Sequence, residues 1–101
     1  MVYTHYLEEY TKTITTDKYG ISHETLTLAH KFWAYLEKLN KEVIQERYGI
    51  EIPEGYFFIS KHQPAVGNVI KIGGDKYNVT LVKPVYRRAK ILSHYEGLLG
   101  K

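Results

Sequence analysis

Apolar residues recur every three or four positions between Ser22 and Tyr48, which is the period of one face of an α-helix. Ser22 suits the N-cap position, because its hydroxyl can accept hydrogen bonds from the free N–H groups of a first turn. Gly49 is a natural residue to end the helix, and Pro53 follows shortly after it. The pattern predicts one long amphipathic helix over residues 22–48, with an apolar face made of Ala29, Phe32, Leu36, Leu39 and Val43.

The predicted helix is long for a chain of 101 residues. At a rise of roughly 1.5 Å per residue it would span about 40 Å. A compact domain of this size has a diameter of about 30 Å. We therefore expect a second subunit to cover part of the helix in a homodimer. The candidate interface residues are Trp33, Tyr35, Val43, Ile44 and Tyr48.

Short extended segments surround this helix. Residues 10–16 are rich in β-branched and aromatic residues, which is typical of a strand, and their alternating threonines favour a place at the edge of a sheet. Residues 56–60 form a second predicted strand. Residues 69–72 and 77–82 flank a Gly73-Gly74-Asp75-Lys76 turn, which predicts a β-hairpin. Residues 2–7 are compatible with an earlier strand or with one helical turn.

The C-terminal segment returns to a helical spacing of apolar residues. Residues 85 to about 96 predict a short helix that ends near Gly97, and a strand from Tyr86 to Leu92 is the alternative. The resulting fold class is α+β in a single domain of residues 1–101. It consists of a small antiparallel sheet of three to four strands packed on one long amphipathic helix, plus the short C-terminal helix.

Charge divides the chain into two unequal halves. Residues 1–52 contain six Lys and Arg against eight Asp and Glu, a net charge of −2, whereas residues 53–101 contain eight against three, a net charge of +5. A basic half favours a polyanionic partner. The segment from Lys83 to Lys90 concentrates four cations around one tyrosine. The candidate nucleic-acid contacts are Lys83, Tyr86, Arg87, Arg88 and Lys90, with Lys61, Lys71 and Lys76 as an extension.

Residues for catalysis or metal binding do not form a recognisable motif. The five histidines have no His-x-x-x-His pair, and the chain contains no cysteine, so no metal site and no cofactor are predicted. Arg88 and His94 match a loose Arg-x4–6-His spacing of certain all-helical ribonucleases, but the strand-rich middle of the chain contradicts that helical context. Of the three functions that the sequence suggests, a nuclease-like enzyme is therefore the least favoured.

The leading expectation is a non-enzymatic, homo-oligomeric interaction or assembly module. A nucleic-acid-binding protein that uses residues 83–90 of a dimer is the alternative. The N-terminus lacks the charged and apolar regions of a signal peptide, and no apolar run is long enough to span a bilayer. Together with the absence of cysteine, this predicts a cytoplasmic protein without a membrane partner or a small-molecule substrate.

Overall fold

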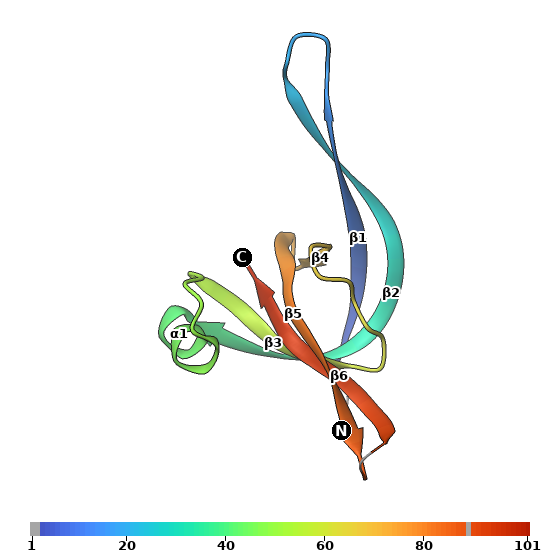
Figure 1. The fold of residues 1–101 in the computed structure, drawn as a ribbon, viewed down its shortest axis with the longest axis vertical. Coiled ribbons are helices and arrows are strands. Elements are labelled where there is room, and N and C mark those ends of the chain that lie inside the picture. Colours follow the sequence, from blue (N-terminus) through green and yellow to red (C-terminus); the bar gives the residue numbers. More distant parts are fainter. Residues whose placement is uncertain (1–2, 89) are drawn as a thin grey trace.

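The regular structure in the described residues, 3–88 and 90–101, consists of six antiparallel strands and one short helix in a computed structural model (Figure 1). The helix α1 (Lys41–Tyr48) lies between the second and third strands. The strands are β1 (His5–Thr16), β2 (Ser22–Asn40), β3 (Glu54–Ser60), β4 (Val69–Ile72), β5 (Asp75–Arg87) and β6 (Ile91–Gly100).

The strands close into a barrel in the order β1-β2-β3-β6-β5-β4. The closing contact is short: Glu8, Glu9 and Tyr10 of β1 pair with three residues of β4. Gly97 lies at a crowded point of the barrel, because a Cβ atom there would stand only 1.8 Å from the carbonyl oxygen of Leu81. Because the strands form this barrel and the one helix is short, the predicted α+β fold of a sheet packed on a long helix is wrong. The protein is mostly β.

Two hydrophobic clusters stabilise the barrel. The first fills the interior and includes Leu7, Phe32, Phe58, Ile70 and Leu99. The second contains Leu39, Ile44 and Leu98, with partly buried residues of the 43–57 segment packed around it. Helix α1 thus covers one outer side of the sheet near β3 (Figure 1). Burial of apolar surface in these two places is the main favourable contribution to folding.

The predicted long helix over 22–48 is replaced by the strand β2 followed by the short helix α1. The segment satisfies two periods at once, because Phe32, Ala34 and Leu36 also alternate, as the inward positions of a strand do. The same segment is rich in threonine and aromatic residues, which favours a strand. Asn40, and not Ser22, is the N-cap, since its side chain accepts a hydrogen bond from the Val43 N–H at 2.9 Å.

Gly49 ends α1, as the sequence predicts. Its φ of +69° lies in the left-handed region, and its N–H donates to the Gln45 carbonyl oxygen at 2.9 Å. Glycine adopts this conformation without steric cost, which explains its place after the last helical residue. No helix in residues 3–88 and 90–101 has the length and apolar character needed to cross a membrane.

The predicted C-terminal helix is also wrong. Residues up to Arg87 continue β5, and residues from Ile91 onwards form β6, so the segment is a hairpin. Ala89, which the predicted helix included, lies outside the described residues. The hairpin predicted for 69–72 and 77–82 is present, as β4 pairs with β5 around Gly73 and Gly74. Both glycines have positive φ angles there, as a tight turn requires.

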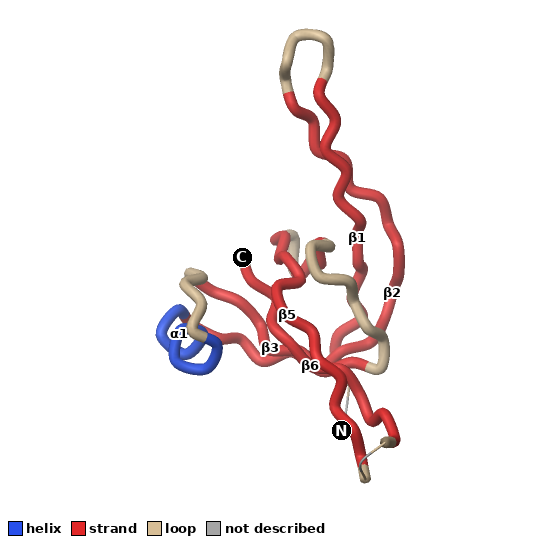
Figure 2. Tube along the Cα trace, viewed as in Figure 1, coloured by secondary structure: helices blue, strands red, loops and turns tan. Residues whose placement is uncertain are grey.

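Two hairpins extend beyond the barrel (Figure 2). The first, here called the β1–β2 arm, comprises residues 11–27, where β1 pairs with β2 alone. The second, the β5–β6 arm, comprises residues 85–94, because β3 stops pairing with β6 at Tyr95. The arms give the molecule its elongated extents of 55 × 29 × 26 Å. Residues 10–16, predicted at a sheet edge, lie mostly in the first arm.

Candidate functional site

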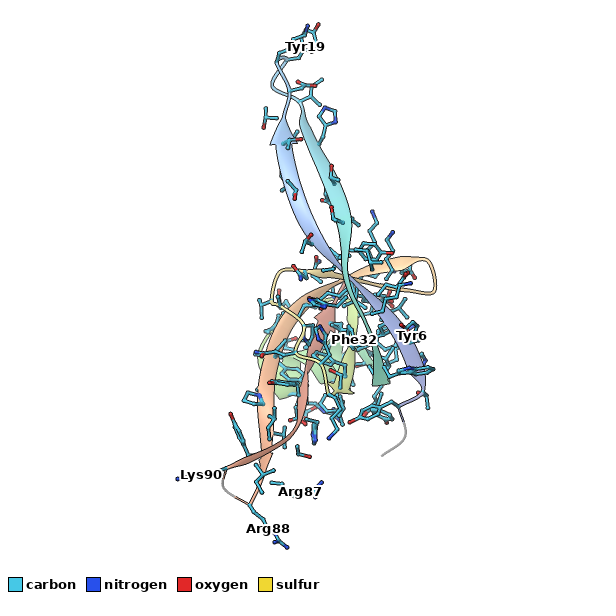
Figure 3. All side chains as sticks on the ribbon, turned by 90° about the vertical axis from the view of Figure 1, so that its right-hand side faces the viewer. Tyr6, Tyr19, Phe32, Arg87, Arg88 and Lys90 are labelled. Carbon is cyan, nitrogen blue, oxygen red and sulfur yellow. The ribbon has the colours of Figure 1, made fainter. Side chains whose placement is uncertain are left out.

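The β5–β6 arm carries a cluster of cations at its end. Arg87 pairs with Ile91 as the last rung of the hairpin, and Arg88 and Lys90 lie in the turn between the strands. In Figure 3 the side chains of Arg88 and Lys90 project away from the barrel. Arg88 has a φ of +48°, and its carbonyl oxygen accepts a hydrogen bond from the Lys90 N–H at 2.7 Å. A side chain costs about 1 kcal/mol or more in this left-handed conformation.

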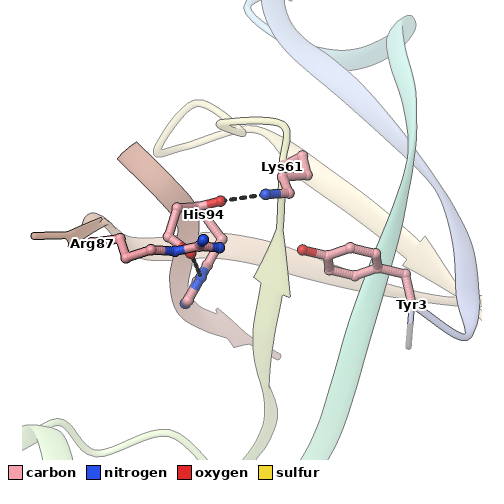
Figure 4. Close-up of a pocket in the computed structure, with 5 residues that line it drawn as sticks. Tyr3, Lys61, Arg87 and His94 are labelled. Carbon is pink, nitrogen blue, oxygen red and sulfur yellow. Dashed lines mark hydrogen bonds between the residues drawn. The ribbon is translucent and has the colours of Figure 1, made fainter. Parts of the chain in front are cut away.

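A shallow pocket of about 360 Å³ lies beside the base of this arm. Its lining residues come from four parts of the chain: the N-terminal segment, the end of β3, the end of β5 and the start of β6. Figure 4 shows the hydroxyl of one of them, a tyrosine, pointing across the pocket towards the cations. The lining residues are Tyr3, Lys61, Arg87, Ser93 and His94.

Hydrogen bonds hold the pocket walls together. Lys61 follows β3, and its Nζ donates to the carbonyl oxygen of Ser93 at 2.6 Å, so this cation is fixed against β6 (Figure 4). The Ser93 hydroxyl lies 3.0 Å from Nδ1 of His94. A β-bulge between Val85 and Tyr86 leaves Ser93 as the extra residue on β6. Bulges of this kind redirect side chains, and they are common near binding sites.

Positive charge dominates the pocket. Lys61 and Arg87 are permanent cations, and the lining residues that the structure describes include no carboxylate. Glu96 adjoins this lining: its Oε1 forms an ion pair with Nζ of Lys83 at 3.2 Å, and its Oε2 lies 3.9 Å from Nε2 of His94. We call Lys61, Arg87, Arg88, Lys90 and His94 the basic end of the protein. This surface suits phosphate groups, since Arg and Lys neutralise them.

Of the eight predicted nucleic-acid contacts, the structure brings four together at the basic end: Lys61, Arg87, Arg88 and Lys90. Lys61 joins the residues of the 83–90 segment, although Lys83 is paired with Glu96. Lys71 and Lys76 face each other across β4 and β5, at the opposite end of β5 from Arg87. At roughly 3.3 Å per residue, Lys76 lies about 35 Å from Arg87 along the strand. Lys71 and Lys76 therefore do not extend the basic end.

The predicted dimer interface does not form one face. Val43, Ile44 and Tyr48 belong to α1, and Ile44 is fully buried within the chain while the other two pack against the same cluster. Trp33 and Tyr35 belong to β2 instead. Trp33 is 55% exposed. Because the common helix is absent, the helix-to-helix pairing that motivated this set is contradicted.

The sequence alone did not single out Tyr3 or Tyr6, and it placed Trp33 on a helix as a dimer contact. Tyr3 lines the pocket, and Tyr6 and Trp33 form an exposed aromatic pair on the outer surface beside it. Only the register of β1 against β2 places Tyr6 opposite Trp33. The available signal was the alternation of β1, in which the outward Tyr6 and Glu8 flank the inward Leu7.

A second polar cluster lies buried at the base of the β1–β2 arm. Glu9 is 1% exposed, and one of its oxygens lies 2.7 Å from Nε2 of His62. The other oxygen accepts hydrogen bonds from the Ala65 N–H at 2.9 Å and from Asn68 at 2.6 Å. The ring of His62 also packs against Phe32. These contacts attach the 61–68 loop to β1.

The protonation of Glu9 follows from these contacts. Burial by itself would raise the pKa of the Glu9 carboxyl, but the hydrogen bonds from Ala65, His62 and Asn68 outweigh it and hold the pKa below its ordinary value. With both oxygens engaged, this carboxylate acts as an anchor for the loop. In residues 3–88 and 90–101, no three His, Asp or Glu side chains are grouped as a metal site would need.

The fold and the basic end define a class of protein: a closed, six-stranded antiparallel barrel with two protruding hairpins, one of which is cationic. No protein-family model and no curated protein sequence matches the chain. The structure is similar to the solution structure of protein SF1141 from Shigella flexneri 2a, with a TM-score of 0.65 and 19% sequence identity. The match covers 98% of this chain and 92% of that one, and it shows a shared fold.

Proposed function

We propose that this protein is a non-enzymatic nucleic-acid-binding protein that contacts the phosphate backbone through its basic end. The observation that supports this most is the convergence of Lys61 and Arg87 on one pocket, next to Arg88 and Lys90 in the turn of the β5–β6 arm. Closely spaced cations at the end of a projecting hairpin can neutralise several phosphates of one strand. A small anion would occupy only the pocket, and it would not account for the cations in the turn of the arm.

The surroundings of the site support binding and not catalysis. His94 is the one histidine in the described lining of the pocket, and the carboxylate of Glu96, at 3.9 Å from its Nε2, is too far for a hydrogen bond. The closest histidine–carboxylate contact, between His62 and Glu9, has its carboxylate buried and fully hydrogen-bonded. Because the sequence has no cysteine, we expect the protein to act in a reducing, cytoplasmic compartment.

The test is a salt titration of binding to labelled single-stranded and double-stranded DNA and RNA. For a single strand, the slope of log K against log salt is about −0.7 for each neutralised phosphate. The triple variant Arg87→Ala, Arg88→Ala, Lys90→Ala should therefore reduce the magnitude of the slope by about 2 and weaken binding at low salt. The matched control removes three remote cations, with Lys12, Lys18 and Lys76 changed to Ala.

The control variant should bind like the wild type, because its three cations lie on the other arm or at the far end of β5. Equal losses in both variants would mean that binding follows net charge and not the basic end. If none of these nucleic acids shows salt-dependent binding, the proposed function is overturned.

A second candidate function, self-association, is favoured by the β1–β2 arm. This ribbon has two open edges and exposes Ile14, Tyr19 and Ile21. Open strand edges are templates for pairing with another chain, so a second copy of this protein could add its own arm edge to edge. A dimer mass in light scattering at high salt, lost in the Ile14→Lys, Ile21→Lys variant, is the expected result. A wild-type monomer at tens of micromolar would contradict this candidate.

A further inference from the structure

Tyr6 and Trp33 form an aromatic pair on the outer surface of the barrel. They lie directly opposite each other on β1 and β2, with ring centroids 5.1 Å apart and planes tilted by 49°. Each side chain is 55% exposed. Figure 3 shows Tyr6 on the outside of the barrel, on the side away from the interior that Phe32 occupies. Two large aromatic rings left in water are unusual for a surface that has no ligand.

The strand register places this pair beside the basic end. Ala34, the neighbour of Trp33, pairs with Ser60, and Ser60 pairs in turn with Tyr95. β3 ends at Ser60, so Trp33, Lys61 and His94 each lie one residue beyond this last paired rung, on three neighbouring segments. Since neighbouring strands are about 4.8 Å apart, Lys61 lies one strand from Trp33 and His94 lies two strands from it. The hydrogen bond from Lys61 to the Ser93 carbonyl fixes this order.

The charges around the aromatic pair are nearly balanced. Glu8, two residues after Tyr6, faces Lys31, and the closest atoms of this pair lie 3.9 Å apart. The Tyr10 hydroxyl donates a hydrogen bond to Glu8 at 3.1 Å. Negative charge next to the rings is thus partly neutralised, whereas the pocket lining contributes the cations Lys61 and Arg87. A ligand here meets an apolar surface first and a cationic surface next to it.

We propose that the nucleic acid bound at the basic end is single-stranded, and that its bases stack on Tyr6 and Trp33 while its phosphates contact Lys61 and Arg87. This inference rests on the proposed function and specifies its substrate. Every base has a π face that an aromatic ring can cover, and stacking of this kind is tolerant of sequence. In a duplex those faces are already stacked on neighbouring bases, so an aromatic pair on an outer surface selects against duplex.

The experiment uses the fluorescence of Trp33, which is the only tryptophan in the sequence. Titration with single-stranded oligothymidine should quench and shift its emission as a base covers the indole. Polyphosphate is the matched probe, because it carries the charge without bases. It should compete for the basic end and leave the emission of Trp33 unchanged. Duplex DNA should bind more weakly than the single strand and quench less.

Two substitutions measure what stacking contributes. Trp33→Ala and Tyr6→Ala should each weaken binding of the single strand by roughly 5- to 100-fold, the range expected for losing one stacked base. Neither should change the slope of log K against log salt, because no cation is removed. Trp33→Phe should retain most of the affinity. Tyr19→Ala, an exposed aromatic at the tip of the β1–β2 arm, is the control and should bind like the wild type.

The outcomes separate this inference from the proposed function. Salt-dependent binding that disappears in the Arg87, Arg88, Lys90 variant, without quenching and with no effect of Trp33→Ala or Tyr6→Ala, would overturn the inference and leave the proposed function standing. Tighter binding to duplex than to single strand would also overturn it. If no nucleic acid binds, both the proposed function and this inference are overturned. The aromatic pair would then be assigned to contact with a protein partner.

Discussion

The two arms of this protein are alike in architecture but differ in composition and charge. Both are two-stranded antiparallel hairpins that leave the same barrel, and both begin near a β-bulge, at Glu9/Tyr10 in one case and at Val85/Tyr86 in the other. The β1–β2 arm is rich in threonine, and its Lys12 lies 3.8 Å from Glu24. The β5–β6 arm ends in three closely spaced cations. The difference teaches that two hairpins of the same shape can present different charges, and our proposal of a ligand rests on the charge of the β5–β6 arm.

The arms also differ in how they are attached to the barrel. At the base of the β1–β2 arm, the buried Glu9 accepts hydrogen bonds from the 61–68 loop and lies against His62. At the base of the β5–β6 arm, the anchoring ion pair joins Lys83 to Glu96 in a half-exposed position. A buried anchor stabilises the fold, whereas an exposed pair contributes little. We therefore expect changes at the first base to affect stability and changes at the second arm to affect binding.

The largest expected effect is on stability at the buried anchor. Glu9→Ala leaves His62, Asn68 and the Ala65 N–H without their acceptor inside the protein, so it should lower the free energy of unfolding by about 3 kcal/mol. Chemical denaturation monitored by circular dichroism measures this. The matched variant Glu96→Ala should cost less than about 1 kcal/mol, since that pair is screened by solvent. Similar losses in the two variants would contradict the contrast between the bases of the arms.

The same anchor predicts a dependence on pH. The pKa of Glu9 is lower in the folded state than its ordinary value, so its stabilising contribution is fully present above the ordinary pKa of a glutamate. The contribution is lost as the pH falls through the folded pKa. The stability difference between the wild type and Glu9→Gln should therefore be largest at neutral pH and shrink under acidic conditions. A difference that stays constant with pH would show that the carboxylate charge is not what anchors the loop.

A smaller effect separates stability from binding at the tip of the β5–β6 arm. Arg88 holds a positive φ that glycine adopts at no steric cost, so Arg88→Gly should raise the free energy of unfolding by about 1 kcal/mol. It should also weaken nucleic-acid binding, because one cation is removed. Gly20 of the other arm already has a positive φ, and Gly20→Ala should destabilise that turn without changing binding. Loss of stability in Arg88→Gly would mean that the side chain, and not the backbone, sets the turn.

The local signals in the sequence were reliable where glycine carried them. Gly73 and Gly74 predicted the β4–β5 turn, and Gly49 predicted the end of the helix, because each requires a positive φ. The nucleic-acid contact predicted for the cations from Lys83 to Lys90 stays a prediction, although Arg87, Arg88 and Lys90 do lie together at the end of the β5–β6 arm. The signals failed where one spacing satisfied two periods. Phe32 and Leu36 lie four positions apart, which fits a helical turn and two strand alternations equally well.

The remainder of the site depends on contacts between distant residues. Lys61 reaches the β5–β6 arm only because β3 pairs with β6, and Tyr6 meets Trp33 only through the register of β1 against β2. The spacing of apolar residues from Ala89 to Tyr95 also fits a helix, so the sequence did not predict the turn in which Arg88 and Lys90 lie. No local propensity encodes such pairings, because they are selected by burial of the barrel interior as a whole.

The measurement that tests the account most directly is a map of amide chemical shifts in the presence of a short single-stranded oligonucleotide. Both arms are observed in one experiment under the same conditions. We expect the shifts to change at Lys61, at residues 87–94 and at the indole of Trp33, with residues 11–27 unaffected. Changes concentrated on residues 11–27, or none at the basic end when the nucleic acid is in excess, would contradict the assignment of the ligand to the cationic arm.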